Sequence, residues 1–426
     1  MEKKVNTVSQ YIGGDLKLLL IGIDGGNWDV INSMIKKGKL PTLKKLMKKG
    51  KYGVLKSTIP PQTVPAWQSM FTGKNPGELG AVGFLVKRGN DFIFANSELW
   101  RGQFVWDKLS SKGYKVGVLN VPGSYPAYRI NGVIITGMLT PSKKPHTYPA
   151  GLLENEDYQI DPETGTLLLG KEALFKELVE INKKRFVVFK KLVNKYKFDV
   201  VFMVFTITDR VQHFMWDDKK KIEKSYEIVD KEISYFVNKY KNIIIVSDHG
   251  FARLENPFFI NDWLEKNGYL RRKLTMKFKM LELLPKSLAF YIMKFVPETM
   301  KKIDILASVD MEKTEAYSIC SNSIFLNKKS VMNELLEDLN NLDFGKAYSS
   351  EKLFKVKNPD LPEIVMDPKK GSFCYHLSKK VFETKTKKSG EHTRDGIFIG
   401  YGKNVKKVNK IEDISSLVLN IMKRYY

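Results

Sequence analysis

The sequence has few cysteines and no long apolar run, and each absence excludes a class of protein. Its two cysteines, Cys320 and Cys374, stand outside any CxxC pair, which excludes a disulfide framework and suits a reducing compartment. No charged segment followed by an apolar run opens the chain, so we expect no signal peptide. The most apolar stretches, 16–23 and 200–205, are shorter than the roughly 20 residues that cross a bilayer. We expect a cytoplasmic protein, with peripheral membrane contact left open.

Acidic residues are also scarce relative to basic ones. The chain has 71 Lys and Arg against 47 Asp and Glu, a formal charge of +24. Such an excess attracts phosphate esters, nucleic acid or an anionic membrane, although a lysine-rich proteome with solvated helix faces gives the same excess. No RRM, helix-turn-helix or zinc-finger signature accompanies the charge, so nucleic acid is not the expected partner.

The pattern along the 426 residues favours an α/β fold. Short β-branched runs alternate with helical patterns, which is typical of a mostly parallel sheet with helices on both faces. The expected strands are 17–23, 116–121, 133–136, 200–205, 243–246 and 397–400.

The chain is long for one core, so we expect an interrupted domain. The expected parts are a first core segment at 17–269, a helical insertion at 270–310 and a second core segment at 311–426. The insertion mixes leucines and phenylalanines with many basic residues. We interpret it as a cap over the active site, with a dimer face or a contact with an anionic membrane as alternatives.

Polar residues follow three of the expected strands. Asp24 follows the first strand, Asp209 and His213 follow the fourth, and Asp248 and His249 follow the fifth. The carboxyl ends of parallel strands meet where ligands bind, and Asp and His are common ligands of divalent ions. Each residue alone also suits a helix cap, a turn or an ordinary surface histidine. Their shared edge favours a metal site.

Thr63 precedes a helical pattern at 64–71 that has Pro65 in its first turn and Gly73 at its end. We expect Thr63 to be the N-cap, a role worth about 1 kcal/mol. The same position also suits catalysis, because helix starts bind phosphate oxygens and a metal can activate the hydroxyl as a nucleophile.

His392 lies in a polar loop before the last expected strand, and it would be an ordinary loop residue if no metal needed a ligand. His146 and His376 have no comparable context, so we expect both to be structural.

Taken in order, these motifs resemble the type I phosphodiesterase/nucleotide pyrophosphatase family of the alkaline phosphatase superfamily. The resemblance covers about residues 17–405 and rests on the following: Asp24, Thr63-x-Pro65, TGKNPG at 72–77, Asp209-x-x-x-His213, Asp248-His249-Gly250 and His392. It implies an alkaline phosphatase-like fold and a hydrolase with two metal ions. One ion would be held by Asp209, His213 and His392.

The resemblance further implies that Asp24, Asp248 and His249 hold the second ion, and that Thr63 contacts the metal pair and attacks phosphorus. The mixed oxygen and nitrogen ligands suit zinc best, while manganese and iron also fit. Two such ions about 4 Å apart stabilise the attacking and leaving oxygens. The reaction would pass through a phosphothreonine that water hydrolyses, with retention at phosphorus.

Other superfamily members fit less well. Sulfatases need Cys or Ser at the position of Thr63 and Arg at the position of Trp67, and alkaline phosphatases and phosphoglycerate mutases typically use Ser. The chain also departs from the best-known nucleotide pyrophosphatases, because Phe84 stands about where they have an Asn that binds phosphate. Asn27 or the Val64 N–H are candidates to replace that Asn. Phe84 itself would suit a hydrophobic or lipid-like ester.

The expected function is therefore a metal-dependent phosphodiesterase or pyrophosphatase. The alternative is a phosphomonoesterase or a phospho(alcohol)transferase that acts on a lipid- or sugar-linked substrate. A non-enzymatic binder of anions or nucleic acid is disfavoured, because every metal ligand and the nucleophile are present. The sequence leaves open the substrate, the native metal and the oligomeric state.

Overall fold

The computed structural model describes residues 16–89, 91–141, 146–163, 165–273, 309–379 and 388–425. The chain divides into two compact units: unit 1 is Met1–Leu254 with Lys388–Tyr426, and unit 2 is Glu255–Lys387. These boundaries differ from the expected ones, because the expected second core segment, 311–426, includes residues 311–379, which belong to unit 2. The reason is that their strands pair with one another and not with the central sheet. The expected insertion at 270–310 lies almost entirely outside the described residues and stays a prediction.

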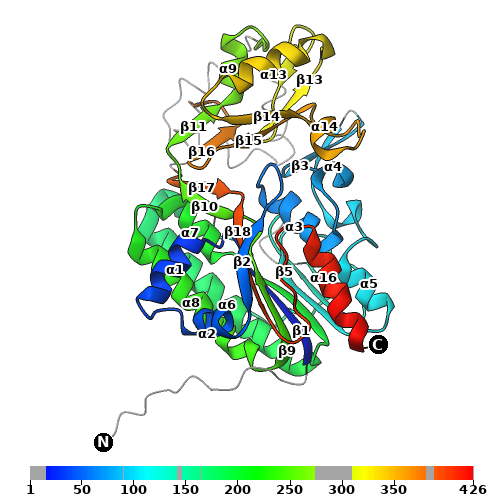
Figure 1. Ribbon diagram of the computed structural model, residues 1–426, viewed down its shortest axis with the longest axis vertical. Coiled ribbons are helices and arrows are strands. Elements are labelled where there is room, and N and C mark those ends of the chain that lie inside the picture. The colour runs from blue at the N-terminus through cyan, green and yellow to red at the C-terminus, as the bar shows by residue number, and fades with distance from the viewer. Residues whose placement is uncertain are drawn as a thin grey trace, which may run out of the picture. The chain divides into compact units, whose positions relative to one another are not determined.

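Unit 1 is built on a mostly parallel, eight-stranded sheet of order β2-β18-β9-β1-β8-β5-β6-β7 (Figure 1). Its strands are β1 (Leu16–Ile23), β2 (Lys51–Lys56), β5 (Val116–Val121), β6 (Gly132–Thr136), β7 (Thr147–Tyr148), β8 (Val200–Phe205), β9 (Tyr240–Val246) and β18 (Asp395–Tyr401). Strands β9, β1, β8, β5 and β6 are parallel, whereas β18 is antiparallel to its neighbours and β7 is antiparallel to β6. All the expected strands are present, so the expected α/β sheet is confirmed.

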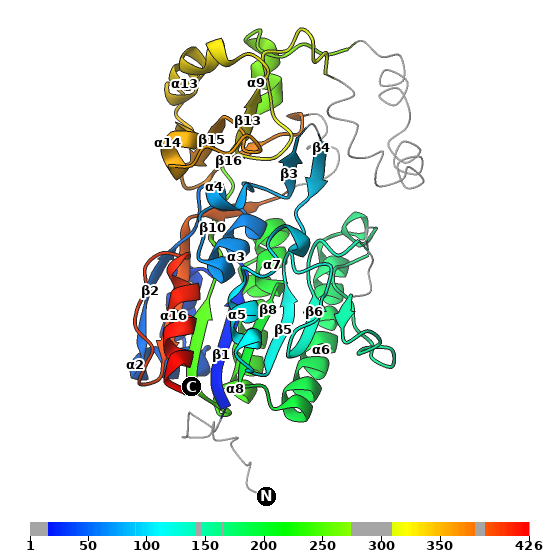
Figure 2. The same cartoon turned by 90° about the vertical axis from the view of Figure 1, so that its right-hand side faces the viewer.

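Helices cover both faces of this sheet. Alternate residues of β1 point to opposite sides of the sheet, and both sets of side chains are buried against helices. Leu18 and Leu20 pack with α3 (Thr63–Thr72), α5 (Val105–Ser111) and α16 (Asp413–Met422) (Figure 2). Leu19 and Ile21 pack on the other side. The helices there are α1 (Trp28–Lys36), α2 (Pro41–Lys49), α6 (Lys171–Tyr196), α7 (Ile207–Met215) and α8 (Lys219–Val237).

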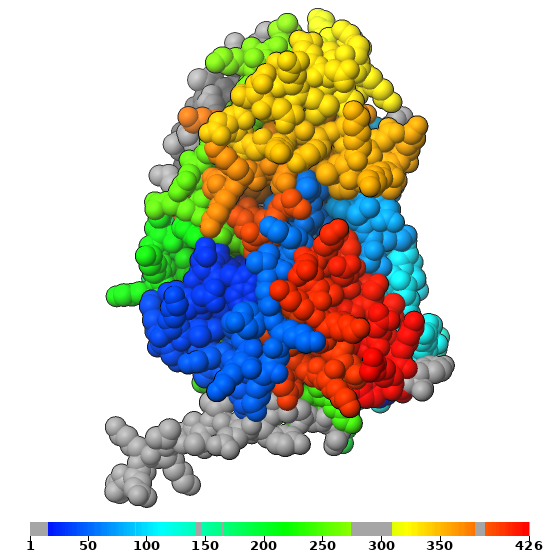
Figure 3. Space-filling view, in the orientation of Figure 1, coloured from blue at the N-terminus to red at the C-terminus, as the bar shows by residue number. Residues whose placement is uncertain are grey.

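Short elements complete unit 1. They are α4 (Pro76–Leu79), the hairpin of β3 (Leu85–Arg88) and β4 (Asp91–Phe94), and the antiparallel pair β10 (Gly250–Arg253) and β17 (Gly390–Thr393). The segment around β2 and the segment after β18 are far apart in the sequence but lie side by side on one face (Figure 3). The Lys56 N–H donates to the Asn409 carbonyl there, and the Ile411 N–H donates to the Lys56 carbonyl.

Unit 2 has sheets of its own. A four-stranded sheet has the order β12 (Ala316–Tyr317), β13 (Ser323–Leu326), β15 (Ile364–Pro368) and β14 (Gly345–Ser349), and β11 (Asn256–Phe259) pairs in parallel with β16 (Ser372–Tyr375). Its described helices are α9 (Ile260–Lys266), α13 (Met332–Asn340) and α14 (Ser350–Phe354). Cys320 and Cys374 are both free and buried in this unit. Across the described part of the chain, no helix is long and apolar enough to span a membrane.

A buried acid joins two helices of unit 1. Both carboxyl oxygens of Glu232 on α8 lie within hydrogen-bonding distance of the Asn182 amide nitrogen on α6, at 2.9 and 2.8 Å. Burial raises the pKa of Glu232 to about 8, so the folded protein holds a proton there at neutral pH.

This raised pKa predicts a loss of stability with rising pH. The unfolded chain releases the Glu232 proton near pH 4.3, so its contribution is fully present below that pH and is lost as pH rises through about 8. Between pH 5 and pH 9, the free energy of unfolding of the wild type should fall relative to Glu232→Gln by on the order of a few kcal/mol. Urea denaturation at both pH values measures this. Glu180→Gln, at an exposed α6 position, should follow the wild type, and parallel wild-type and Glu232→Gln curves would contradict the assignment.

Candidate metal centre

Three neighbouring strands of the sheet deliver acidic and imidazole side chains to one edge. In the parallel register, Ile23 of β1 lies opposite Phe205 of β8, and Gly22 lies opposite Val246 of β9. Asp24 directly follows β1, the Asp248-His249 pair follows β9, and α7 with Asp209 and His213 follows β8. These side chains therefore meet at the carboxyl edge, as the sequence predicts.

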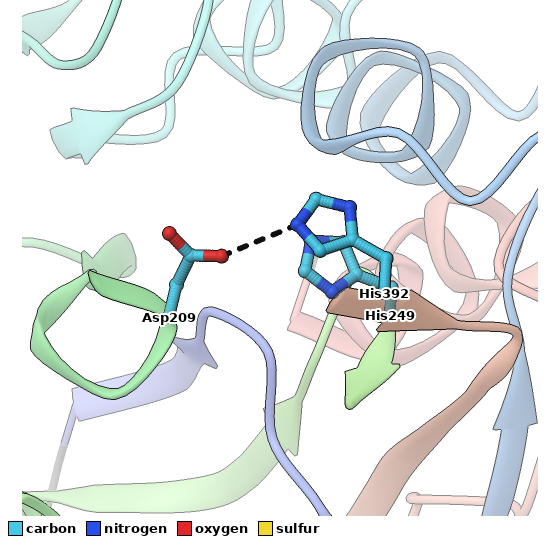
Figure 4. A group of neighbouring side chains, drawn as sticks. All are labelled: Asp209, His249 and His392. Atoms are coloured by element: carbon cyan, nitrogen blue, oxygen red, sulfur yellow. Dashed lines mark ion pairs between the residues drawn. The ribbon is translucent and has the colours of Figure 1, made fainter. Parts of the chain in front are cut away.

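His392 reaches the same place through the β10–β17 pair. Strand β10 continues from His249, and the antiparallel register sets Phe251 of β10 opposite His392 of β17. As a result, the rings of His249 and His392 stack with their centroids 3.5 Å apart (Figure 4). A residue from the C-terminal part of the chain thus joins side chains from the start and the middle.

Thr63 lies beside these histidines, but it is not the N-cap of α3. Gln62 is the N-cap, since its carbonyl accepts the first helical hydrogen bond, from the Ala66 N–H at 3.0 Å. The expectation of a capping threonine is therefore wrong by one position. The Thr63 hydroxyl makes no capping bond, and its Oγ1 lies 3.3 Å from Nε2 of His249. This position leaves the hydroxyl beside the expected metal ligands, which are called the metal-ligand cluster below: Asp24, Asp209, His213, Asp248, His249 and His392.

The first set of expected ligands converges on one point. Asp209 Oδ1 lies 3.3 Å from Nε2 of His213 and 3.4 Å from Nε2 of His392 (Figure 4), and the two Nε2 atoms are 2.9 Å apart. Ligand atoms of a tetrahedral zinc ion, each about 2.0–2.2 Å from the metal, stand roughly 3.3–3.6 Å apart. Two of the three distances match that spacing, and the third is shorter.

The second set adjoins the first. Nε2 of His249 lies 3.1 Å from Oδ2 of Asp248 and 3.7 Å from Oδ1 of Asp24. These three residues place ligand atoms within 4.8 Å of one another, and so do Asp209, His249 and His392. The side chains assigned to two ions therefore form one continuous cluster.

The three carboxylates of the cluster are buried, and each is half satisfied. One oxygen of each carboxylate contacts a donor of the protein. Asp24 accepts a hydrogen bond from the Trp67 indole, and Asp248 accepts one from the Gly25 N–H. Asp209 forms an ion pair with the Arg210 guanidinium. The other oxygens have no hydrogen-bond partner within the described ranges; they are Oδ1 of Asp24, Oδ2 of Asp248 and Oδ1 of Asp209. Buried anionic oxygens of this kind are stabilised by cations, so the donor set fits divalent metal ions.

The electrostatics of the cluster differ from group to group. Burial raises the pKa of Asp24 well above its usual value, and the charges of Asp248 and Asp209 raise it further. Burial acts the same way on Asp209, but the charge of His213 and contacts with His213 and His392 outweigh it and hold the Asp209 pKa well below its usual value. Burial lowers the pKa of His392 to about 4, so this ring is neutral and can donate a lone pair at neutral pH.

A close approach between β1 and α3 fixes Asp24. A Cβ atom at Gly22 would stand 2.3 Å from Cη2 of Trp67, so only glycine lets the indole lie against the strand. Nε1 of Trp67 then reaches Oδ2 of Asp24 at 3.4 Å, and the Thr208 hydroxyl donates to the Asp24 carbonyl at 2.6 Å. This packing also positions α3, whose first residue is Thr63.

Sequence reasoning missed two charged neighbours of the cluster. Glu391 is buried, and its Oε1 lies 3.4 Å from Nδ1 of His213. The second is Arg210, whose Nη1 lies 3.5 Å from Oδ2 of Asp209. The only signal for either is its place next to an expected ligand, His392 or Asp209, which by itself indicates no role.

Asn27 already makes several hydrogen bonds within the fold, so the suggestion that it binds phosphate stays a prediction with little support. Its Oδ1 caps α1 by accepting from the N–H groups of Asp29 and Val30, and its Nδ2 donates to the Phe251 carbonyl at 2.5 Å. The amide oxygen and one N–H of the amide nitrogen are therefore used within the fold. His146 accepts a hydrogen bond from the Ala127 N–H, and its structural role stays a prediction.

Comparison with known families decides the class of this chain. The model of the family type I phosphodiesterase/nucleotide pyrophosphatase matches residues 18–395. The chain belongs to this family. The resemblance seen in the sequence and the expected enzyme class, a phosphoric ester hydrolase, are thereby confirmed. Members of the family depend on metal ions, which agrees with the clustered ligands.

Solved structures give the same fold. Phosphonoacetate hydrolase from Sinorhizobium meliloti 1021 in complex with phosphonoformate has a TM-score of 0.66 at 14% identity, over 96% of this chain and 97% of that chain. Murine ectonucleotide pyrophosphatase/phosphodiesterase 5 in complex with AMP has a TM-score of 0.60 at 14% identity, over 96% and 95%. The alkaline phosphatase-like fold is thus confirmed. A comparison with curated protein sequences finds no match.

The half-satisfied carboxylates predict that metal ions stabilise the fold. We expect zinc to raise the melting temperature over that of the chelator-treated protein by about 10 °C, because binding to the folded state alone stabilises it. Asp209→Asn should lose most of this difference. Asp230→Asn alters a buried acid that accepts from the Thr42 and Leu43 N–H groups, and it should keep the full difference. Equal melting temperatures of the wild type with zinc and with chelator would contradict the metal assignment.

Proposed function

We propose that this protein is a two-metal-dependent phosphodiesterase or pyrophosphatase that hydrolyses a phosphate ester or anhydride through a phosphothreonine at Thr63. Asp209, His213 and His392 would hold one ion, and Asp24, Asp248 and His249 the other. The observation that carries this proposal is the position of Thr63, with its Oγ1 3.3 Å from His249 Nε2, beside carboxylate oxygens that lack hydrogen-bond partners among the described residues.

The start of α3 supports binding of the reacting phosphate. The N–H groups of Thr63 and Val64 are the first of the helix, and neither has a backbone acceptor in the described part of the chain. Free N–H groups at a helix start bind phosphate oxygens. The Val64 N–H therefore stays a candidate for the role that an Asn has in the best-known relatives.

The proposed reaction uses these positions. Thr63 Oγ1 attacks phosphorus and gives up its proton to solvent, the bond between phosphorus and the leaving oxygen breaks, and a phosphothreonine forms. Water then attacks phosphorus from the vacated side and loses a proton. The bond to Thr63 breaks and its oxygen is protonated again, so two inversions give retention. The divalent ions, when bound, lower the pKa of the Thr63 hydroxyl and neutralise charge on the attacking and leaving oxygens. Zinc suits the donor set best.

The substrate in this proposal is a small-molecule or lipid-linked phosphate compound. The neighbours with solved structures include a phosphonoacetate hydrolase and a complex with AMP, which supports a small substrate. Phe84 packs partly buried against the hydrophobic core of unit 1. Contact of residues 270–310 with an anionic membrane and a cytoplasmic location both stay predictions.

Hydrolysis of bis-p-nitrophenyl phosphate and p-nitrophenyl phosphate in zinc or manganese tests the proposal. We expect the wild type to prefer the diester, Thr63→Ala to lose at least about 1000-fold in kcat, and Thr63→Ser to keep measurable activity. Thr72→Ala is the matched control, because the Thr72 hydroxyl bonds the Gln68 carbonyl at the far end of the same helix. Full activity in Thr63→Ala would refute the nucleophile, and monoester preference would favour the phosphomonoesterase alternative.

A further inference from the structure

A guanidinium lies directly beside the metal-ligand cluster and has no part in the proposed function. Arg210 is on α7, next to Asp209, and its Nη1 lies 3.5 Å from Oδ2 of that carboxylate. Its Nη2 donates to Oδ1 of Asp161 at 2.9 Å and lies 3.0 Å from the sulfur of Met138. Loops on the far side of the arginine therefore hold its guanidinium against the cluster.

This guanidinium keeps N–H groups that make no hydrogen bond to a described residue, although its Nη1 also faces Asp209. Both of its hydrogen bonds come from Nη2, so Nε and Nη1 donate none within the ranges that the structure describes. The Arg210 side chain is 24% exposed, which leaves these donors open to a ligand. Arginine is always charged and presents its donors in a fork that matches phosphate oxygens.

A second arginine adds positive charge behind the first. Arg185 on α6 is 4% exposed, and it donates to the Gln159 carbonyl and the Thr206 hydroxyl. Among the described residues, no carboxylate oxygen lies within 4.0 Å of its guanidinium nitrogens. Arg185 and Arg210 line the same small cavity, with Asp161 as its acidic member. Asp161 is the one carboxylate that lines this cavity, and Asp209, which also lies against Arg210, is shared with the proposed metal site. The excess charge favours an anion here.

We propose that Arg210 binds a second negative charge of the substrate, next to the charge of the reacting phosphate. This inference rests on the proposed function and names its substrate class. The second charge lies either on a neighbouring phosphate, as in a pyrophosphate anhydride, or on the reacting phosphorus, as in a phosphomonoester. Either source supplies an anionic oxygen to Nε and to the N–H of Nη1 that does not face Asp209. Asp161 is then a positioning residue that orients the guanidinium.

Three p-nitrophenyl compounds measured with the zinc-loaded protein test this inference. Bis-p-nitrophenyl phosphate carries one negative charge, whereas bis-p-nitrophenyl pyrophosphate and p-nitrophenyl phosphate carry a second. We expect Arg210→Gln to lower kcat/KM by about 100-fold for the preferred doubly charged compound and by less than about fivefold for the diester. Asp161→Asn should raise KM for the same compound several-fold, and Arg210→Lys should restore part of the loss.

Two controls separate this role from a structural one. Arg253→Gln removes the same charge from an exposed ion pair with Asp217, and it should leave all three rates unchanged. The zinc content of Arg210→Gln should match the wild type, because the metal ligands stay in place, and zinc should still raise its melting temperature. Loss of zinc, or an equal loss of activity on all compounds, would show that Arg210 only orders Asp209 and would overturn the inference.

Activity on the three compounds also distinguishes the two possible positions of the second charge, and it distinguishes failure of this inference from failure of the proposed function. A selective loss on the pyrophosphate places the second charge on a neighbouring phosphate, and a selective loss on the monoester places it on the reacting phosphorus; either supports the inference. Activity that depends on Thr63 without any selectivity in Arg210→Gln would refute this inference alone. Absence of wild-type activity on all compounds with zinc bound would instead refute the proposed function, and this inference with it.

Discussion

The burial of three carboxylates at one sheet edge is the constraint on which this structure depends. Asp24, Asp209 and Asp248 each have one oxygen held by the protein and one without a hydrogen-bond partner among the described residues. Like charges so close together are costly in a buried site unless cations lie between them. The neutral His392 ring and the hydroxyl of Thr63 stand beside the same oxygens. Metal binding is therefore the simplest physical reason for this arrangement.

The fold meets this constraint through elements that are rigid and distant in sequence. Parallel strands β9, β1 and β8 end at the same edge, so their next residues meet without any long loop. The β10–β17 pair then brings His392 against His249, and the Gly22–Trp67 contact aligns α3 with the end of β1. Ligands on strand ends and helices keep their spacing better than ligands on loops would. Thr63 and the proposed metal ligands thus share one framework.

Hydrophobic runs and strand ends made the central sheet and the residues that follow its strands predictable from the sequence. Strands such as β8 and β5 are buried on both faces, so their apolar runs mark them clearly. The N-cap position of α3 was missed because Gln62 caps with its backbone alone, which leaves no side-chain signal. Unit 2 was missed because its short strands pair only with one another. The contact between Arg210 and Asp161 joins an α7 residue to a loop before α6, and no local pattern indicates it.

The central claim is that these side chains hold two metal ions beside Thr63. Crystals equilibrated with zinc, with diffraction measured on both sides of the zinc absorption edge, test it most directly. The account predicts two anomalous peaks about 4 Å apart, one against Asp209, His213 and His392 and the other against Asp24, Asp248 and His249. A single peak, or peaks that lie away from these side chains, would contradict it.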